Sequence, residues 1–315
     1  MKQNYLNQVG LLVEIIPYCF DSVPLALKGG TALNFFYNNM PRLSVDLDCV
    51  YVDRGKPRDE ALAEIDDILI HLTDTLRSEG FGVQKSVSPI TKIVVSAGRD
   101  LVKVKINPFF RGVLLYPEFM PFCENVQTVF QVSGNTEIPL LNRDELYAGK
   151  ILAALDRQHP RDLFDVGVLM QNGGISDLML DCFTVYLAAH GRPAHEVLMG
   201  PDKDIDRMFE NDFAGMTDWE VSLEDLKAIR SELRETVVTQ LGKDRYQFLY
   251  SVLETSPQWD LMPFELSDLP ALQWKLKNLD HLHTTNPEKF ESQLDAINDI
   301  YLNYGSQHSR HHSRR

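Results

Sequence analysis

Apolar and polar residues alternate along the chain with two different periods, and the dominant period changes near residue 140. Before that point, apolar residues at helical spacing predict helices over 4–20 and 58–80. A short element over 25–30 is either a strand or a helix end. Runs rich in Val, Ile and aromatic residues predict strands over 42–52, 81–87, 91–97 and 101–110. The first part of the chain therefore has the pattern of a mixed α/β fold around a small sheet.

After residue 140 the helical period continues to the end of the patterned sequence. Apolar residues at this spacing predict helices over 142–158, 161–172, 176–190, 223–241, 244–255, 269–282 and 287–304. The last residues are polar, basic and aperiodic, which is typical of disorder. We therefore predict an α+β protein with an α/β core over 1–140, a helical domain over 141–304 and a disordered tail over 305–315.

The composition and charge exclude several classes of function. Hydrophobic residues make up 44% of the chain, as in ordinary globular proteins, and the formal net charge is −14. This charge excludes a general basic surface for nucleic acid, so that any RNA contact must be a local patch. The four scattered cysteines form no C-x-x-C pair, which argues against a zinc site and a disulfide framework. Because we find no signal peptide and no membrane-length apolar run, we expect a cytoplasmic protein outside the membrane.

Two adjacent glycines, Gly29 and Gly30, precede a predicted short helix over 31–39, with Thr31 near its N-cap. Glycines at such a turn let the backbone approach a ligand closely, and the free N–H groups of the next helix can bind phosphate. A plain tight turn would use the same residues. The glycine pair alone therefore favours the simpler interpretation.

Two aspartates follow on the next predicted strand. Alternation places Asp46 and Asp48 on one face, opposite Leu47 and Cys49. Neighbouring carboxylates repel each other, and a Mg²⁺ or Mn²⁺ ion between them would remove that repulsion. The alternative is a solvated face of an edge strand, which any D-x-D segment can form. The combination of a glycine pair, one short helix and a D-x-D strand is much rarer by chance, and it favours a metal site.

A third group of charges lies in the helical part, in the segment ELYAGKILAALDRQHPRDLFDVGVL. Lys150 and Arg157 are two helical turns apart, and Asp162 and Asp165 share a face of a helix that begins near Pro160. One interpretation is a solvated helix pair linked by salt bridges. The other is burial, since the charges are surrounded by Leu146, Ile151, Leu155, Leu163, Phe164 and Val168. A buried Lys150 needs an anionic partner, which a triphosphate would provide.

Taken together, these blocks resemble a known family. The segments KGGTALNFFY…PRLSVDLD, VKVKINPFFRG and LYAGKILAALDRQHPRDLFDV are similar to those of AbiEii/AbiGii nucleotidyltransferase toxins, in the polymerase-β-like nucleotidyltransferase superfamily. The resemblance spans residues 25 to 170 in ordered blocks, and the R-D-x-x-D block with its upstream lysine makes it specific. It implies a nucleotidyltransferase-like sheet in the first domain and a helical domain that completes the active site.

The resemblance also implies roles for single residues. The nucleotide-binding residues would be Lys28, Gly29, Gly30, Thr31, Arg42, Ser44, Lys150 and Arg161. The catalytic residues would be Asp46, Asp48, Lys150, Asp162 and Asp165. Asp46 and Asp48 would also be the metal ligands.

The implied activity is transfer of a nucleotide from an NTP to an acceptor, with Mg²⁺ or Mn²⁺ as cofactor. The resemblance suggests an RNA acceptor, such as the 3′ end of tRNA, and a cognate antitoxin in a toxin–antitoxin or abortive-infection system. Two alternatives stay open. One is a nucleotide-binding regulator that has lost catalysis, and the other is a D-x-D glycosyltransferase, which would require a longer Rossmann-like region before its aspartates.

One position departs from the family pattern. Family members carry an acid where this chain has Lys105, on the predicted strand over 101–110. Alternation places Lys103 and Lys105 on the face opposite the core. If this strand lies beside the one with the two aspartates, Lys105 reaches their carboxylates. We therefore expect one tightly held metal ion, with Lys105 in the place of a second.

Overall fold

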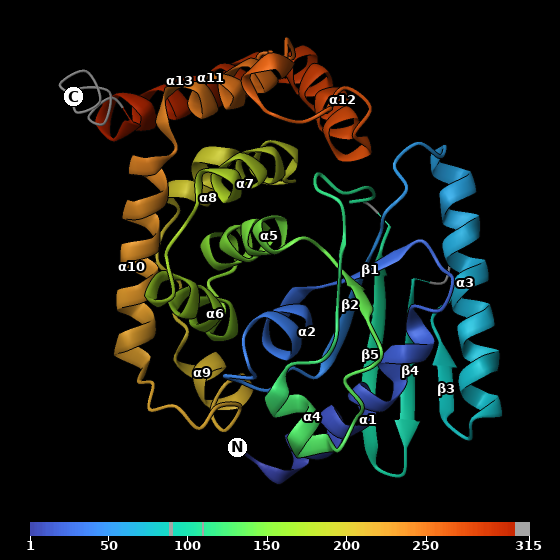
Figure 1. Cartoon of the computed structure of the whole chain (residues 1–315). Coiled ribbons are helices and arrows are strands. Elements are labelled where there is room, and N and C mark those ends of the chain that lie inside the picture. The colour runs from blue at the N-terminus through green and yellow to red at the C-terminus, as the bar shows by residue number, and fades with distance from the viewer. Residues whose placement is uncertain (88–90, 109, 306–315) are drawn as a thin grey trace. The chain divides into compact units, whose positions relative to one another are not determined.

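Figure 1 shows the computed structural model of the chain, which describes residues 1–87, 91–108 and 110–305. The chain forms two compact units. The first comprises Met1–Leu146 and Phe213–Glu220, and the second comprises Tyr147–Asp212 and Val221–Arg315. Except for Gly305, the predicted tail lies outside the described residues. The division into functional domains over 1–140 and 141–304 stays a prediction.

The first unit is built on a seven-stranded mixed sheet with the order β3-β4-β5-β2-β1-β7-β6. The strands are β1 Leu25–Lys28, β2 Asp46–Tyr51, β3 Gly82–Lys85, β4 Lys92–Ala97, β5 Asp100–Asn107, β6 Glu118–Met120 and β7 Ile138–Leu140. β2 lies in the centre, antiparallel to β1 and parallel to β5. All four predicted strands are present, and the element over 25–30 begins as a strand.

One face of this sheet forms the core of the first unit. Alternate residues of β2, β4 and β5 are almost fully buried; they include Leu47, Cys49, Ile93, Val95, Val102, Val104 and Ile106. Two helices run along the sheet, α1 (Gln3–Cys19) and α3 (Arg58–Ser78), which both match their predictions (Figure 1). After the end of α3, Gly80 has a φ of +93°, which is the left-handed conformation that glycine adopts after a helix. The opposite face carries Asp46 and Asp48 on β2 and Lys103 and Lys105 on β5.

Three elements of the first unit were not predicted. α4 (Glu124–Phe130) is a short helix, and β6 and β7 contain three residues each. β7 pairs in parallel with β1 through Leu27 and Leu140, and β6 pairs with β7. Segments this short show no period of their own, so tertiary pairing decides their conformation.

The second unit is helical. Its helices are α5 (Arg143–Asp156, which begins in the first unit), α6 (Pro160–Gln171), α7 (Asp177–Ala189), α8 (Ala194–Met199), α9 (Asp206–Asp212), α10 (Leu223–Gln240), α11 (Gly242–Leu253), α12 (Pro270–Thr285) and α13 (Pro287–Asn303). A 3₁₀ turn at Trp259–Leu261 lies between α11 and α12. The seven predicted helices are confirmed, while the short α8 and α9 were missed. The predicted α+β fold class is therefore correct. Among the described residues, no helix has both the length and the apolar character required to cross a membrane.

Candidate active site

The glycine pair lies at the junction between β1 and the first helical turn of α2 (Gly29–Ala32). The predicted helix over 31–39 begins two residues earlier, at Gly29, so that the N-cap residue near Thr31 is Lys28. The Thr31 side chain is fully buried. Its Oγ1 lies 2.5 Å from the carbonyl oxygen of Asp46 and 2.9 Å from Oγ of Ser44. Thr31 thus ties the helical turn to the start of β2 instead of capping the helix.

Both glycines make room for side chains of the same site. Gly29 has a φ of +76°, and a Cβ atom there would lie 3.1 Å from Oδ2 of Asp48. A Cβ atom at Gly30 would lie 2.6 Å from Nη2 of Arg42. Arg42 is only 2% exposed and donates through Nη1 to the carbonyl oxygen of Leu43. The pair therefore permits close packing of this turn against the aspartate strand.

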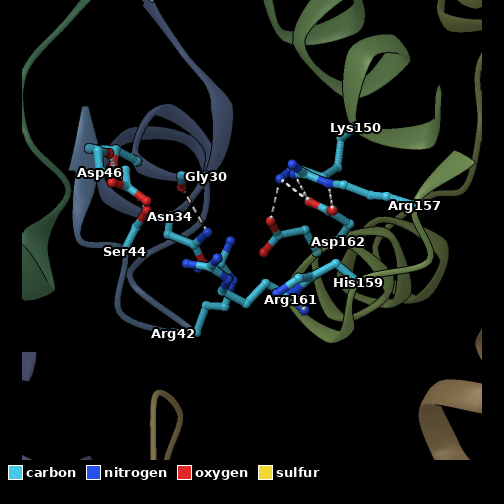
Figure 2. Close-up of polar contacts among 12 residues, drawn as sticks. Gly30, Asn34, Arg42, Ser44, Asp46, Lys150, Arg157, His159, Arg161 and Asp162 are labelled. Carbon is cyan, nitrogen blue, oxygen red and sulfur yellow. Dashed lines mark hydrogen bonds and ion pairs between the residues drawn. The ribbon is translucent and has the colours of Figure 1, made fainter. Parts of the chain in front are cut away.

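The helix continues past α2 as a π-helical turn, Leu33–Tyr37. Asn34, which the sequence did not single out, is fully buried in it and donates to the carbonyl oxygen of Gly30 at 2.8 Å (Figure 2). The only sequence signal is its position four residues after Gly30, one helical turn away. Asn34 supports the backbone of the glycine turn.

Asp46 and Asp48 lie on the predicted face of β2. Their side chains are 29% and 40% exposed, whereas Leu47 and Cys49 between and beyond them are fully buried. The predicted separation of the two faces is therefore confirmed. Because β2 is a central strand, the alternative of an edge strand does not hold.

Lys105 lies beside both aspartates, because β5, on which alternation placed it on the polar face, is the neighbour of β2 in the sheet. In the parallel pair of β2 and β5, Asp48 is the register partner of Lys105. The Lys105 Nζ atom is 3.3 Å from Oδ1 of Asp46 and 3.9 Å from Oδ1 of Asp48. The ammonium thus partly neutralises the two carboxylates.

The donor set suits one hard divalent cation. Mg²⁺ in proteins is held by one or two carboxylates, with waters and substrate phosphates in the other positions, and two partly exposed carboxylates on one strand match that pattern. Among the described residues, no group of three or more His, Cys, Asp or Glu side chains could hold a metal ion. Two carboxylates leave the other coordination positions of such a cation to waters or phosphate oxygens.

The charged cluster of the second unit is buried and internally paired (Figure 2). Lys150 on α5 is 7% exposed, and its Nζ atom lies 2.8 Å from Oδ1 of Asp162 and 3.0 Å from Oδ2 of Asp165. Both aspartates lie on α6 and are 1% exposed. The prediction of burial is confirmed, and so is the shared face of Asp162 and Asp165. The anion that neutralises Lys150 here is a pair of carboxylates.

Arg157 adds a second cation to this cluster. Its Nη2 donates to Oδ1 of Asp162 at 3.0 Å, and its Nε donates to Oδ2. Burial alone would raise the pKa of Asp162, but Lys150 and Arg157 outweigh it and hold the pKa well below the usual value. His159 accepts from the backbone N–H of Arg161 as the N-cap of α6, which begins at Pro160 as predicted.

Comparisons with known proteins identify a family and a similar fold. The sequence model of the family described as "Nucleotidyl transferase AbiEii toxin, Type IV TA system" matches residues 10–296. No curated protein sequence matches the chain. Among solved structures, the fold is similar to that of MenT4, a nucleotidyltransferase toxin from Mycobacterium tuberculosis H37Rv, with a TM-score of 0.56 and 16% identity. The similarity covers 94% of this chain and 95% of that one.

Proposed function

Because the chain belongs to the AbiEii family of nucleotidyltransferase toxins, we propose that it transfers a nucleotide from an NTP to an RNA acceptor. The observation that carries this proposal is the pair of carboxylates on β2 next to the glycine turn. Asp46 and Asp48 point from one face of a central strand, and Gly29 lies against Asp48. Carboxylates of this kind hold the cation of a polyphosphate substrate.

In the proposed mechanism, Asp46 and Asp48 would hold Mg²⁺ or Mn²⁺, which would stabilise the charge on the transferring phosphoryl group. Since Gly29 lies against Asp48, we expect the backbone N–H groups of the turn at Gly29 and Gly30 to donate hydrogen bonds to the triphosphate. Lys28, Thr31, Arg42 and Ser44 belong to the same turn or pack on it. Because Thr31, Arg42 and Ser44 are buried, they would act by fixing the turn that holds the nucleotide, since phosphoryl transfer depends chiefly on positioning and electrostatics.

In the second unit, the predicted site residues lie in or next to the buried ion cluster. Lys150, Asp162 and Asp165 stay predicted catalytic residues, and Arg161 a predicted nucleotide contact, on the strength of the resemblance. The structure supplies another role for the first three, because the ion cluster joins α5 to α6 inside the unit. Measurements on Lys150 must therefore separate nucleotide affinity from stability.

Further features of the proposal follow from the family. A toxin of a type IV toxin–antitoxin system has a cognate antitoxin as its regulator. We propose the 3′ end of tRNA as the acceptor and defence against phage by abortive infection as the biological role. Since NTPs and RNA are cytoplasmic, we expect the enzyme to act there. The family assignment favours nucleotidyl transfer over glycosyl transfer.

The direct test is incubation of the full chain with radiolabelled NTPs, Mg²⁺ and total RNA. We expect labelled RNA from the wild type and none from Asp46→Asn. A matched control is Asp74→Asn, which removes an exposed carboxylate from α3 in the same unit and should leave labelling unchanged. If Asp46→Asn labelled RNA at the wild-type rate, the metal assignment would be wrong.

A second candidate, a regulator that binds nucleotide without transfer, is favoured by one observation. Lys105 already pairs with both aspartates, so a cation must compete with an ammonium of the same chain. NTP binding by the wild type in calorimetry, with no labelled RNA from any RNA pool, would support this candidate.

A further inference from the structure

The face of the sheet that carries the aspartates also carries a group of lysines. Register partners in neighbouring strands project from the same face. One row across the sheet consists of Lys28 on β1, Asp48 on β2, Lys105 on β5 and Lys92 on β4. The next row contains Asp46, Lys103, Val94 and Gln84. We call Lys28, Lys92, Lys103 and Lys105 the lysine face.

Two lysines of this face are the most available to a ligand. The side chains of Lys92 and Lys103 are exposed and form no hydrogen bond or ion pair within the described part of the chain, although Lys103 is the register partner of Asp46. Lys92 is two strands away from Asp48, which corresponds to about 10 Å at the usual strand spacing. Both ammonium groups thus lie within reach of a ligand that already occupies the aspartate site.

The charge of this face is opposite to that of the chain. The two rows contain four lysines and two aspartates, an excess of two positive charges, whereas the whole chain has a net charge of −14. In such an acidic protein, the rest of the surface repels polyanions, and a local basic patch determines where one can bind. The location of this patch, on the strands next to the proposed catalytic carboxylates, suggests that its ligand is a substrate.

We propose that the lysine face binds the phosphate backbone of the acceptor RNA, in the single-stranded stretch that leads to the reacting hydroxyl. This inference rests on the proposed function, and it adds the path of the acceptor. A chain of phosphates matches cations that recur across neighbouring strands, whereas the triphosphate of an NTP is held at the glycine turn. Lys92 and Lys103 would contact the backbone and leave the reaction itself to the aspartate site.

The test measures RNA binding independently of catalysis. A short fluorescein-labelled single-stranded RNA is titrated with the full chain at several salt concentrations, and fluorescence anisotropy gives the affinity. Each phosphate contact contributes about 0.7 to the slope of log K against log salt for single strands. The double variant Lys92→Gln/Lys103→Gln should therefore lower the slope by about 1.4 and weaken binding about 25-fold at about 0.1 M salt.

The control removes the same charge elsewhere. Lys85 on β3 is exposed, but its register partner Ile93 lies in the core, so that Lys85 projects from the face of the sheet opposite the lysine face. Lys289 is exposed on α13. Lys85→Gln/Lys289→Gln should retain the wild-type slope. A lower slope in this control than in the wild type would mean that net charge is the cause, and would overturn the proposal.

The remaining outcomes separate this proposal from the proposed function. Unchanged affinity and slope in Lys92→Gln/Lys103→Gln would overturn the lysine face even if the enzyme labels RNA. The expected slope change without any transfer activity would support the face and contradict the enzyme. If the wild type binds polyglutamate but not the RNA probe, the face binds an acidic protein segment, and the proposal is wrong.

Discussion

Lys105 gives the sharpest test of the aspartate site. Its Nζ atom lies 3.3 Å from Asp46 and 3.9 Å from Asp48, so that it occupies space a metal ion would need. At the dielectric constant of water, each contact contributes about 1 kcal/mol. The side chains of Lys105, Asp46 and Asp48 are 29–40% exposed. Ion pairs with this degree of exposure stabilise a protein by up to about 1 kcal/mol each, so we take about 2 kcal/mol as the upper limit for the two pairs together.

From this magnitude, Lys105→Met should have two opposite effects. The apo protein should lose about 1–2 kcal/mol of unfolding free energy, because two neighbouring carboxylates lose their shared cation. Mn²⁺ should bind about 5–30-fold more tightly, since it no longer competes with the ammonium. The matched control is Lys103→Met, which removes an exposed lysine from the same strand face; among the residues that the structure describes, this lysine has no ion pair.

The assay is a Mn²⁺ titration in the presence of a non-hydrolysable NTP analogue, with free Mn²⁺ followed by electron paramagnetic resonance. We expect one bound ion per nucleotide in the wild type and two in Lys105→Glu, where a third carboxylate joins the site. A wild type that already binds two ions per nucleotide would refute the reasoning. Equal Mn²⁺ affinity in Lys105→Met and Lys103→Met would also refute the reasoning, because the Lys105 ammonium would then not compete specifically with the metal ion.

Two further predictions concern the second unit. Lys150→Met leaves buried Asp162 and Asp165 without their ammonium, and it should lower the free energy of unfolding, measured in urea at neutral pH, by about 3–5 kcal/mol. NTP affinity measured on the folded fraction decides whether Lys150 also binds nucleotide. An unchanged affinity would mean that the role of Lys150 is purely structural. Burial lowers the pKa of Lys275 to about 8, against 10.5 when unfolded. Below pH 8 the folded state thus contains a buried ammonium, which lowers its stability. The free energy of unfolding should therefore rise by up to about 3 kcal/mol as the pH increases from 8 to 10.5. Lys275→Met should abolish this rise with pH, and a rise that persists in the variant would contradict its assignment to Lys275.

Much of the aspartate site could be predicted because β2 and β5 each bury one face. A strand with one buried face has a strict period of two, so that the burial of Leu47 and Cys49 fixes where Asp46 and Asp48 point. The same rule placed Lys105 on the polar face of its strand. Whether the two strands are neighbours is a matter of sheet order, which no local pattern contains, and only the structure shows it.

The partner of Lys150 could not be predicted from the same kind of pattern. The surrounding apolar residues correctly indicated that Lys150 is buried, and burial requires a neutralising anion. The choice between a ligand and the chain's own carboxylates depends on how α5 packs against α6. In the structure, Asp162 and Asp165 both reach Nζ within 3.0 Å. The spacing of Asp162 and Asp165 could show that they share one face of a helix. It could not show that this face packs against Lys150 of another helix.

The glycine pair and the D-x-D strand belong together for a steric reason. The sequence suggested that the glycines admit a ligand, whereas the structure shows that they already admit protein atoms. A Cβ atom at Gly29 would press on the Asp48 carboxylate, and one at Gly30 would overlap the guanidinium of Arg42, which is buried and cannot turn away. Thr31 then joins the turn to the backbone of Asp46. The turn and the strand are thereby fixed to each other, so that the glycine turn and the two carboxylates proposed to bind the metal ion lie side by side before any substrate binds. Such preorganisation is what positioning catalysis requires.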